Sequence, residues 1–417
     1  MRIRSIVGVA SWPVWVAFWP VLGSAQPVSS LVEEALRNSR EVLAAQKKYE
    51  ALRQRPSQES ALPDPVLSLG YVSNGPPWPG AGLGTNPTSN LGLSVSQEMP
   101  APGKRGLRGQ IAGKEAEAAF DDYLALRLNV TARLKQAYHE LHHAIVAAEF
   151  VKRYQEQMRN ILSISEARYT VGRAAQPDIF KAQTQLAVFE TQLVRYEQER
   201  AAKEIEINAL LNRQTGGHIE IPEDVPLGEM APPLEELLAR ARQHAPMLAR
   251  DRAAVQQSEL ATNLARKDYY PDYTVSGGYF NQGGMAPMWQ VRVDFKLPAY
   301  FWRKQRAEVA QQVYAASGAR NAYGATEIAL EARVRELYSV AEAAYKLAGL
   351  YEKSVTPEAR LTLESSMASY ETGKVDFTSL FSNFMNVVDY ELAYHEQVMQ
   401  FQVALAQLEE ATGVAIR

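Results

Sequence analysis

Four segments of the chain alternate apolar and polar residues with a period of two. The clearest alternation sets Trp289, Val291, Val293 and Phe295 against Gln290, Arg292, Asp294 and Lys296, and a second sets Leu91, Leu93 and Val95 against Gly92, Ser94 and Ser96. Successive side chains of a strand point to opposite faces, so each segment predicts a strand with one apolar and one polar face. Each is also roughly as long as the 9–11 residues of a tilted strand that crosses a bilayer. A half-exposed sheet in a soluble sandwich shows the same pattern and is the alternative.

Elsewhere the apolar residues recur with the three-four spacing of packed helices. One series is Leu380, Phe384, Val387, Tyr394, Val398, Phe401, Leu405 and Leu408, interrupted at Glu391, and another is Leu330, Val334, Leu337, Ala341, Ala344, Ala348, Tyr351 and Val355. From Leu107 to Tyr169 the only helix-breaking residues are two glycines in the first turns. At about 1.5 Å per residue this helix approaches 90 Å, and the period near 3.5 predicts coiled-coil packing. Pro357 is expected to kink or end its helix.

These elements occur twice along the chain. "PDPVLSLGY" at 63–71 aligns with "PDYTVSGGY" at 271–279, and "YTVG" at 169–172 matches "YETG" at 370–373. The period is far longer than that of a solenoid, so it indicates two copies of one architectural unit, at 26–225 and 226–417. The predicted strands are about 65–73, 90–98, 272–280 and 289–297. The predicted long helices are about 105–170, 177–213, 302–372 and 377–412.

Composition and the N-terminus restrict the class of protein. The 417 residues contain no cysteine, which excludes disulfides and thiolate sites. Their formal net charge of −3 argues against a nucleic-acid partner, which would favour a basic face. Arg2 and Arg4 precede an apolar run and the small residues Gly23-Ser24-Ala25. Residues 1–25 therefore predict a signal peptide and export, and no later apolar run reaches the roughly 20 residues of a spanning helix.

The sequence "YHELHHAIV" contains the zinc-peptidase pattern HExxH, with His139 and His143 as ligands and Glu140 as base. A peptidase also needs a third ligand from a separate element and an open position for water. The acidic residues that follow lie on the same predicted helix. Glu166, for example, is 23 residues after His143, so a straight helix would hold it about 34 Å away from that ligand. No enzymatic activity and no cofactor are therefore expected. His139, His142 and His143 remain weak candidates for binding a metal ion, against the plainer interpretation as polar helix-surface residues.

Four membrane-length strands cannot close a barrel, because the smallest outer-membrane barrels need about eight. An open sheet in lipid leaves two edges of unpaired backbone groups, each costing several kcal/mol. If the strands span a membrane, several copies must pool them. Three chains give twelve strands and twelve long helices. The alternative is a periplasmic coiled-coil adaptor or scaffold that never enters a membrane.

The duplicated halves, paired strands and Tyr-x-x-Gly tips, with the stretch "SVTPEARLTLESSMASYETGKVDFTSLFSNF" at 354–384, resemble the TolC family of outer-membrane efflux proteins. The resemblance covers essentially all of the mature chain and favours the heavy-metal and drug efflux branches. It implies a mainly α protein with a membrane β-barrel, assembled as a homotrimer with a 12-stranded barrel on an α-helical tunnel. It also implies an outer-membrane channel that extends into the periplasm and conducts passively, with a periplasmic adaptor and an inner-membrane pump as partners. The sequence does not identify the cargo.

The resemblance further assigns residues to parts of such a channel. The tips facing the adaptor are Tyr169, Val171, Gly172 and Arg173 in the first repeat and Tyr370, Thr372, Gly373 and Lys374 in the second. The positions of the periplasmic gate are Asp178, Ser379 and Ser382. The expected barrel lumen contains Ser94, Ser96, Glu98, Arg292, Asp294 and Lys296, with Tyr71, Tyr279, Phe280 and Trp289 at the outer rim. Two plainer roles stay open: the tips as helix C-caps, and Asp178 as a first-turn carboxylate.

Overall fold

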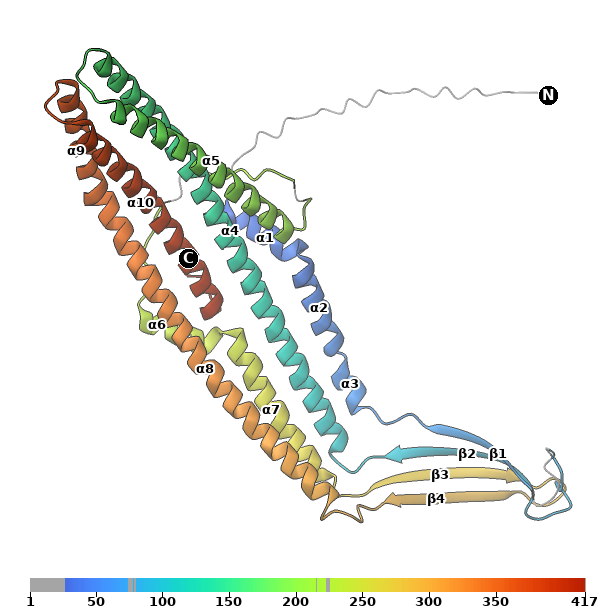
Figure 1. Cartoon of the computed structure of the whole chain (residues 1–417). Helices are drawn as coiled ribbons and strands as arrows, with labels where there is room; N and C mark the ends of the chain where they lie inside the picture. The colour runs from blue at the N-terminus through green and yellow to red at the C-terminus, as the bar shows by residue number, and fades with distance from the viewer. Residues whose placement is uncertain (1–26, 74–77, 79, 215, 223–225, 417) are drawn as a thin grey trace, which may run out of the picture.

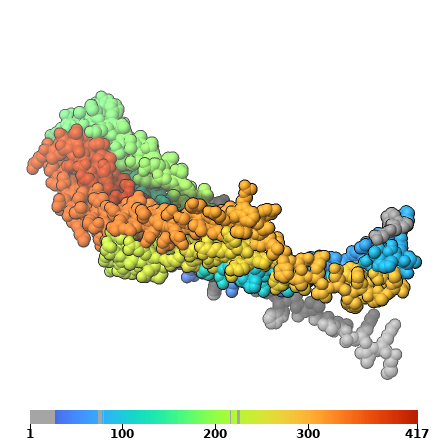
Figure 2. All heavy atoms as spheres, turned by 90° about the horizontal axis from the view of Figure 1, so that it is seen from below, coloured from blue at the N-terminus to red at the C-terminus, as the bar shows by residue number. Residues whose placement is uncertain are grey.

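The computed structural model describes residues 27–73, 78, 80–214, 216–222 and 226–416. The expected signal peptide at 1–25 lies outside the described residues. The molecule is elongated, with long helices at one end and a narrow sheet projecting from the other (Figures 1 and 2). In the described part, no helix combines the length and apolar character needed to cross a membrane.

Four long helices form the body of the molecule. They are α4 (Lys104–Thr170), α5 (Gln176–Leu210), α8 (Lys304–Leu350) and α10 (Phe377–Thr412). Shorter helices lie along them: α1 (Val28–Asn38), α2 (Arg40–Leu52), α3 (Arg55–Ser60), α6 (Leu234–His244), α7 (Pro246–Lys267) and α9 (Thr356–Glu371). Helix α4 packs against α5, α7 and α10, so the two halves of the chain share one helical body (Figure 1).

The predicted helix 302–372 is not a single α-helix. It is divided by a π-helical turn at Tyr351–Val355, after which α9 begins with Pro357 in its first turn. Proline has no N–H to donate, so it is tolerated there but not inside a regular helix. The π turn keeps the path nearly continuous while it absorbs the missing hydrogen bond. The predicted helix 177–213 also ends earlier, at Leu210.

The strands form one antiparallel sheet in the order β1-β2-β3-β4. The strands are β1 (Val66–Val72), β2 (Asn90–Met99), β3 (Asp272–Asn281) and β4 (Met288–Lys296). The central pair joins the two halves of the chain, with Ser96 opposite Ser276. Among the described strands, β1 and β4 each pair on one side only, so both edges of the sheet are open.

Three apolar clusters stabilise the helical body. The cluster nearest the tips joins α4, α5, α9 and α10, with Phe189 and Phe384 fully buried. A second cluster packs α6 against α8 and α10 around Phe401, and a third packs α1 and α2 against α4 around Leu134. The predicted apolar series on α8 and α10 supply about half of the buried residues of the second cluster, and the α10 series adds Leu380, Phe384 and Val387 to the first.

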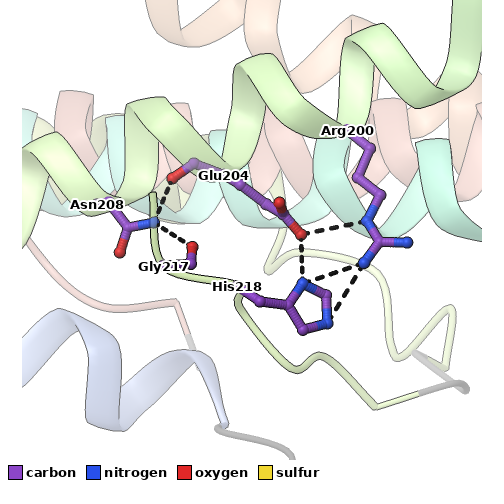
Figure 3. A network of polar contacts seen from close by, with 5 residues as sticks. All are labelled: Arg200, Glu204, Asn208, Gly217 and His218. Atoms are coloured by element: carbon purple, nitrogen blue, oxygen red, sulfur yellow. Dashed lines mark hydrogen bonds and ion pairs between the residues drawn. The ribbon is translucent and has the colours of Figure 1, made fainter. Parts of the chain in front are cut away.

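Polar side chains fix the connections between these elements. Near the C-terminal end of α5, Asn208 donates to the carbonyl oxygens of Glu204 and Gly217. In the same helix the side chain of Glu204 accepts from Arg200 and contacts His218 at 2.7 Å (Figure 3). At the junction of helices and sheet, the buried Lys104 Nζ lies 2.9 Å from carboxylate oxygens of both Asp268 and Asp272. Burial opposes the charge of Lys104, but these two carboxylates outweigh it and raise its pKa.

Candidate functional site: the two-faced sheet and the helical tips

One face of the sheet is apolar across all four strands. The register aligns Leu69 with Leu93, Leu93 with Tyr279, and Tyr279 with Trp289. The side chains on this face are Leu67, Leu69, Tyr71, Leu91, Leu93, Val95, Gln97, Met99, Tyr273, Val275, Tyr279, Asn281, Trp289, Val291, Val293 and Phe295. Trp289 is 76% exposed and Val291 82%. A contiguous apolar surface of this kind marks contact with a membrane or a partner.

The opposite face is polar, and its charges lie at the end nearest the helices. The predicted lumen residues Glu98, Arg292, Asp294 and Lys296 all lie on this face, as do Ser94 and Ser96. Arg292 Nε donates to Asp294 Oδ2 at 2.9 Å. Positive and negative charges therefore alternate on one surface, which favours contact with water over contact with lipid.

Phe280 lies next to Tyr279 at the end of the sheet farthest from the helices, but on the opposite face. Phe280 pairs with Gly92 and Met288, which places it on the polar face. A Cβ atom at Gly92 would lie 2.5 Å from Cδ1 of Phe280, and one at Gly278 would lie 2.8 Å from Cε2. The ring therefore lies across the backbone of two glycines. Adjacent strand residues point to opposite faces, so Tyr279 and Phe280 cannot share one.

The two tips have the same turn but different surroundings. Gly172 and Gly373 adopt φ values of +70° and +78°, which glycine permits without strain, so both end a helix in the left-handed conformation of a C-cap. Tyr169 is 45% exposed, whereas Tyr370 is 3% exposed. Buried in this conformation, the Tyr370 side chain is not available to a partner.

The buried tyrosine joins the two tips. Arg168 lies over the Tyr370 ring at 4.4 Å and donates to its carbonyl oxygen, while Ser165 Oγ lies 3.0 Å from the Tyr370 hydroxyl. The remaining predicted tip residues are exposed: Val171, Gly172, Arg173, Thr372, Gly373 and Lys374. These residues form a surface made by both halves of the chain.

The residues assigned to the gate lie at the start of the second helix of each tip. Asp178 is in the first turn of α5, and its carboxylate accepts from the Ala175 N–H at 3.3 Å. In the second half, Asp376 performs the capping role by accepting from the Ser379 N–H at 2.7 Å. Ser379 and Ser382 are exposed on α10. Asp178 therefore acts as a first-turn carboxylate in the single chain.

Two residues of the HExxH pattern, Glu140 and His143, line a crevice between α4, α5 and α10. Glu140 is paired with Lys203, whose Nζ is 2.6 Å away. His143 contacts the ring of Tyr196, and burial lowers its pKa against the opposing charges of Glu396 and Glu199. Over the described residues, no group of three or more His, Asp or Glu side chains is arranged to hold a metal ion. The pattern thus supplies two histidines on one helix, and the carboxylate of its glutamate is already paired with Lys203.

Sequence reasoning missed a buried charge on α10. Glu391 is 3% exposed, and Arg360 Nε donates to its Oε1 at 2.5 Å. Burial, together with the Glu391 carboxylate, raises the pKa of Tyr154. The interruption of the apolar series at Glu391 could have indicated a buried charge at this position. It did not indicate the partner of that charge, Arg360, which comes from α9.

Solved structures of outer-membrane channels share this fold. The outer membrane protein VceC of Vibrio cholerae matches with a TM-score of 0.79 at 17% identity, over 94% of this chain and 97% of that chain. The CmeC channel of Campylobacter jejuni matches with a TM-score of 0.76 at 16% identity, over 98% and 94%. The open state of the Neisseria gonorrhoeae MtrE channel matches with a TM-score of 0.76 at 18% identity, over 94% and 89%.

Comparison by sequence gives the family. No curated protein matches the chain. The model of the family "Outer membrane efflux protein" matches residues 31–213 and 237–414, which is most of the chain and confirms the resemblance found in the sequence. The chain therefore belongs to the outer membrane efflux protein family and is a protein of the outer membrane.

Proposed function

We propose that the protein is the exit duct of a tripartite efflux pump, a passive channel through the outer membrane. The observation that supports this proposal best is the two-faced sheet: one face is apolar and exposed, and the other carries Arg292, Asp294 and Lys296. In a bilayer the apolar face contacts lipid and the polar face lines water. A periplasmic scaffold that never entered a membrane would need another cover for this apolar surface.

The open edges of the sheet support a homotrimer. Strands β1 and β4 each leave a row of backbone groups without a strand partner, which lipid cannot satisfy. Pairing β1 of one copy with β4 of the next removes both edges, and three copies give a closed barrel of twelve strands. The helices of three copies then form the tunnel below it.

The helical tips are the proposed docking site for the periplasmic adaptor, through which the inner-membrane pump delivers cargo. The exposed tip residues include Tyr169, Arg173 and Lys374, which present an aromatic ring and two positive charges. Asp178, Ser379 and Ser382 line the narrow end of the tunnel in this proposal. The acidic residue has no counterpart in the second half, so the gate carries one carboxylate per chain.

The proposed activity includes no chemical reaction and no cofactor. Cargo, either small molecules or metal ions, passes down the lumen and is driven by the pump. Glu140 is engaged by Lys203 and is therefore poorly placed to activate a zinc-bound water. His139, His142 and His143 have no assigned role in transport.

Single cysteines test which face of the sheet contacts water, because the natural chain has none. Val291→Cys and Arg292→Cys lie next to each other on β4 and point to opposite faces. In isolated outer membranes, a charged maleimide should label Arg292→Cys at least tenfold faster than Val291→Cys. Equal labelling of the two positions, with release of the protein by a carbonate wash, would support the scaffold instead.

A glycine substitution tests the tip assignment. Gly373→Val places a β-branched residue at φ +78° and should distort the second tip while the barrel still assembles. Co-purification with the adaptor should fall at least tenfold with normal trimer levels. Gly318→Val, at an exposed position of α8 away from the tips, is the matched control. Wild-type docking by Gly373→Val would count against the tips as the adaptor site.

A further inference from the structure

One row of the polar face carries no hydrogen-bonding side chain. The register places Gly70, Gly92, Phe280 and Met288 side by side across the four strands, close to the end of the sheet farthest from the helices. The next row toward the helices already contains Ser68, Ser94 and Gln290. The row is therefore an apolar belt on an otherwise polar surface, and Phe280 is its largest side chain.

Two glycines hold the Phe280 ring against the wall of the sheet. Any side chain at Gly92 or Gly278 would overlap the ring, since their Cβ atoms would lie 2.5 Å and 2.8 Å from ring carbons. Glycine inside a strand weakens it, so two glycines beneath one ring indicate that the flat placement of the ring matters. Lying across the backbone, the ring presents one aromatic face away from the sheet instead of projecting edge-on.

We propose that Phe280 is a cargo-contacting residue at the outer end of the passage, where its ring and Met288 favour organic molecules with flat apolar groups over hydrated ions. This inference rests on the proposed function, which makes the polar face the lumen. Threefold symmetry then places three Phe280 rings at one height in the barrel. The cargo class that the belt favours is therefore organic molecules with flat apolar groups, and Phe280 and Met288 are the residues that contact them.

The chemistry of the belt separates the two kinds of cargo. A hydrated ion that crosses the belt meets no side chain able to replace its water, so it gains nothing from the contact. An aromatic group gains stacking on Phe280 and contact with the thioether of Met288. The charged side chains Arg292, Asp294 and Lys296 lie farther along the sheet, toward the helices, and are not part of the belt.

A thiol reporter beside the ring measures this contact without requiring current through the channel. Ser94→Cys is nearly isosteric, lies opposite Gly278 on the same face, and is the sole thiol of the chain. On the purified trimer we would compare second-order rates of reaction with benzyl and ethyl methanethiosulfonate. Adding Phe280→Ala should lower the benzyl-to-ethyl rate ratio about 3- to 10-fold. Adding Tyr279→Ala, on the opposite face, should leave the ratio unchanged.

The labelling rates distinguish failure of the proposed function from failure of the cargo inference. If Ser94→Cys reacts with neither reagent, the polar face is not an aqueous lumen, and both the proposed function and this inference are overturned. If it reacts with both and Phe280→Ala leaves the ratio unchanged, only the inference is overturned. Should Phe280→Ala fail to assemble, Phe280→Leu keeps an apolar side chain without the aromatic face, and the ratio should still fall about 2- to 3-fold. An unchanged ratio in Phe280→Leu would then reject the inference.

Discussion

Arg168 of the first tip lies over the ring of Tyr370 of the second, 4.4 Å from the ring centre, and donates to its backbone carbonyl oxygen. The two tips are thus one structural unit built by residues 202 positions apart. Their sequences repeat, but their contacts do not. Tyr370 is enclosed, and its counterpart Tyr169 is exposed.

This asymmetry predicts that the same substitution destabilises one tip and has no effect at the other. Tyr370→Phe removes the hydroxyl that contacts Ser165 Oγ. The buried hydroxyl of Ser165 then keeps only its bond to the carbonyl oxygen of Ile161. We expect a loss of about 1 kcal/mol in local stability, seen as faster amide exchange in both tips. Tyr169→Phe should leave exchange at the tips unchanged. Equal protection in the two variants would show that the Tyr370 hydroxyl does not hold the tips together.

The buried Glu391 and its more exposed partner Arg360 predict different effects of their replacement on stability. Arg360→Ala leaves the Glu391 carboxylate buried without its partner and should reduce the free energy of unfolding by about 2 kcal/mol. Glu391→Leu completes the apolar series of α10 and frees Arg360, whose side chain is largely exposed, to contact water. Its stability should equal or exceed that of wild type in thermal unfolding. Destabilisation by Glu391→Leu as large as that by Arg360→Ala would contradict this account.

His143 predicts a stability that depends on pH. Burial lowers its pKa below the value of 6.5 that it has in an unfolded chain, so the unfolded state binds its proton first. The contribution of neutral His143 to stability is therefore complete above about pH 6.5 and is lost as the pH falls toward its folded pKa. His143→Gln should show a smaller loss of melting temperature between pH 7.5 and pH 5 than wild type. An equal loss of melting temperature in His143→Gln and in wild type would contradict this account.

The histidines also give a prediction about the HExxH pattern. Replacing His139 and His143 by alanine should leave metal content and efflux unchanged at equal trimer levels, because a passive duct does not need to hold its cargo tightly. Metal analysis of the purified protein and resistance of cells to the exported compound measure the two effects. A large loss of metal resistance with normal assembly would instead assign these residues to transport.

Local patterns predicted the elements of this fold, and long-range contacts explain what they missed. The period of two in 289–296 predicted both the strand and the separation of its faces. The same rule, applied to Tyr279 and Phe280, would have separated them. The equivalence of Tyr169 and Tyr370 failed because Arg168 and Ser165, which enclose Tyr370, come from the other half of the chain. The π turn before Pro357 could be expected as a kink, but its form depends on how α8 and α9 pack on α10.

The central claim is that open sheet edges force copies of the chain to share one barrel, and native mass measures this most directly. The mature protein, extracted from outer membranes in mild detergent, should have the mass of three chains, and the particle should need detergent to stay in solution. A monomer that is released without detergent would contradict the shared barrel and leave the apolar face of the sheet to a different partner.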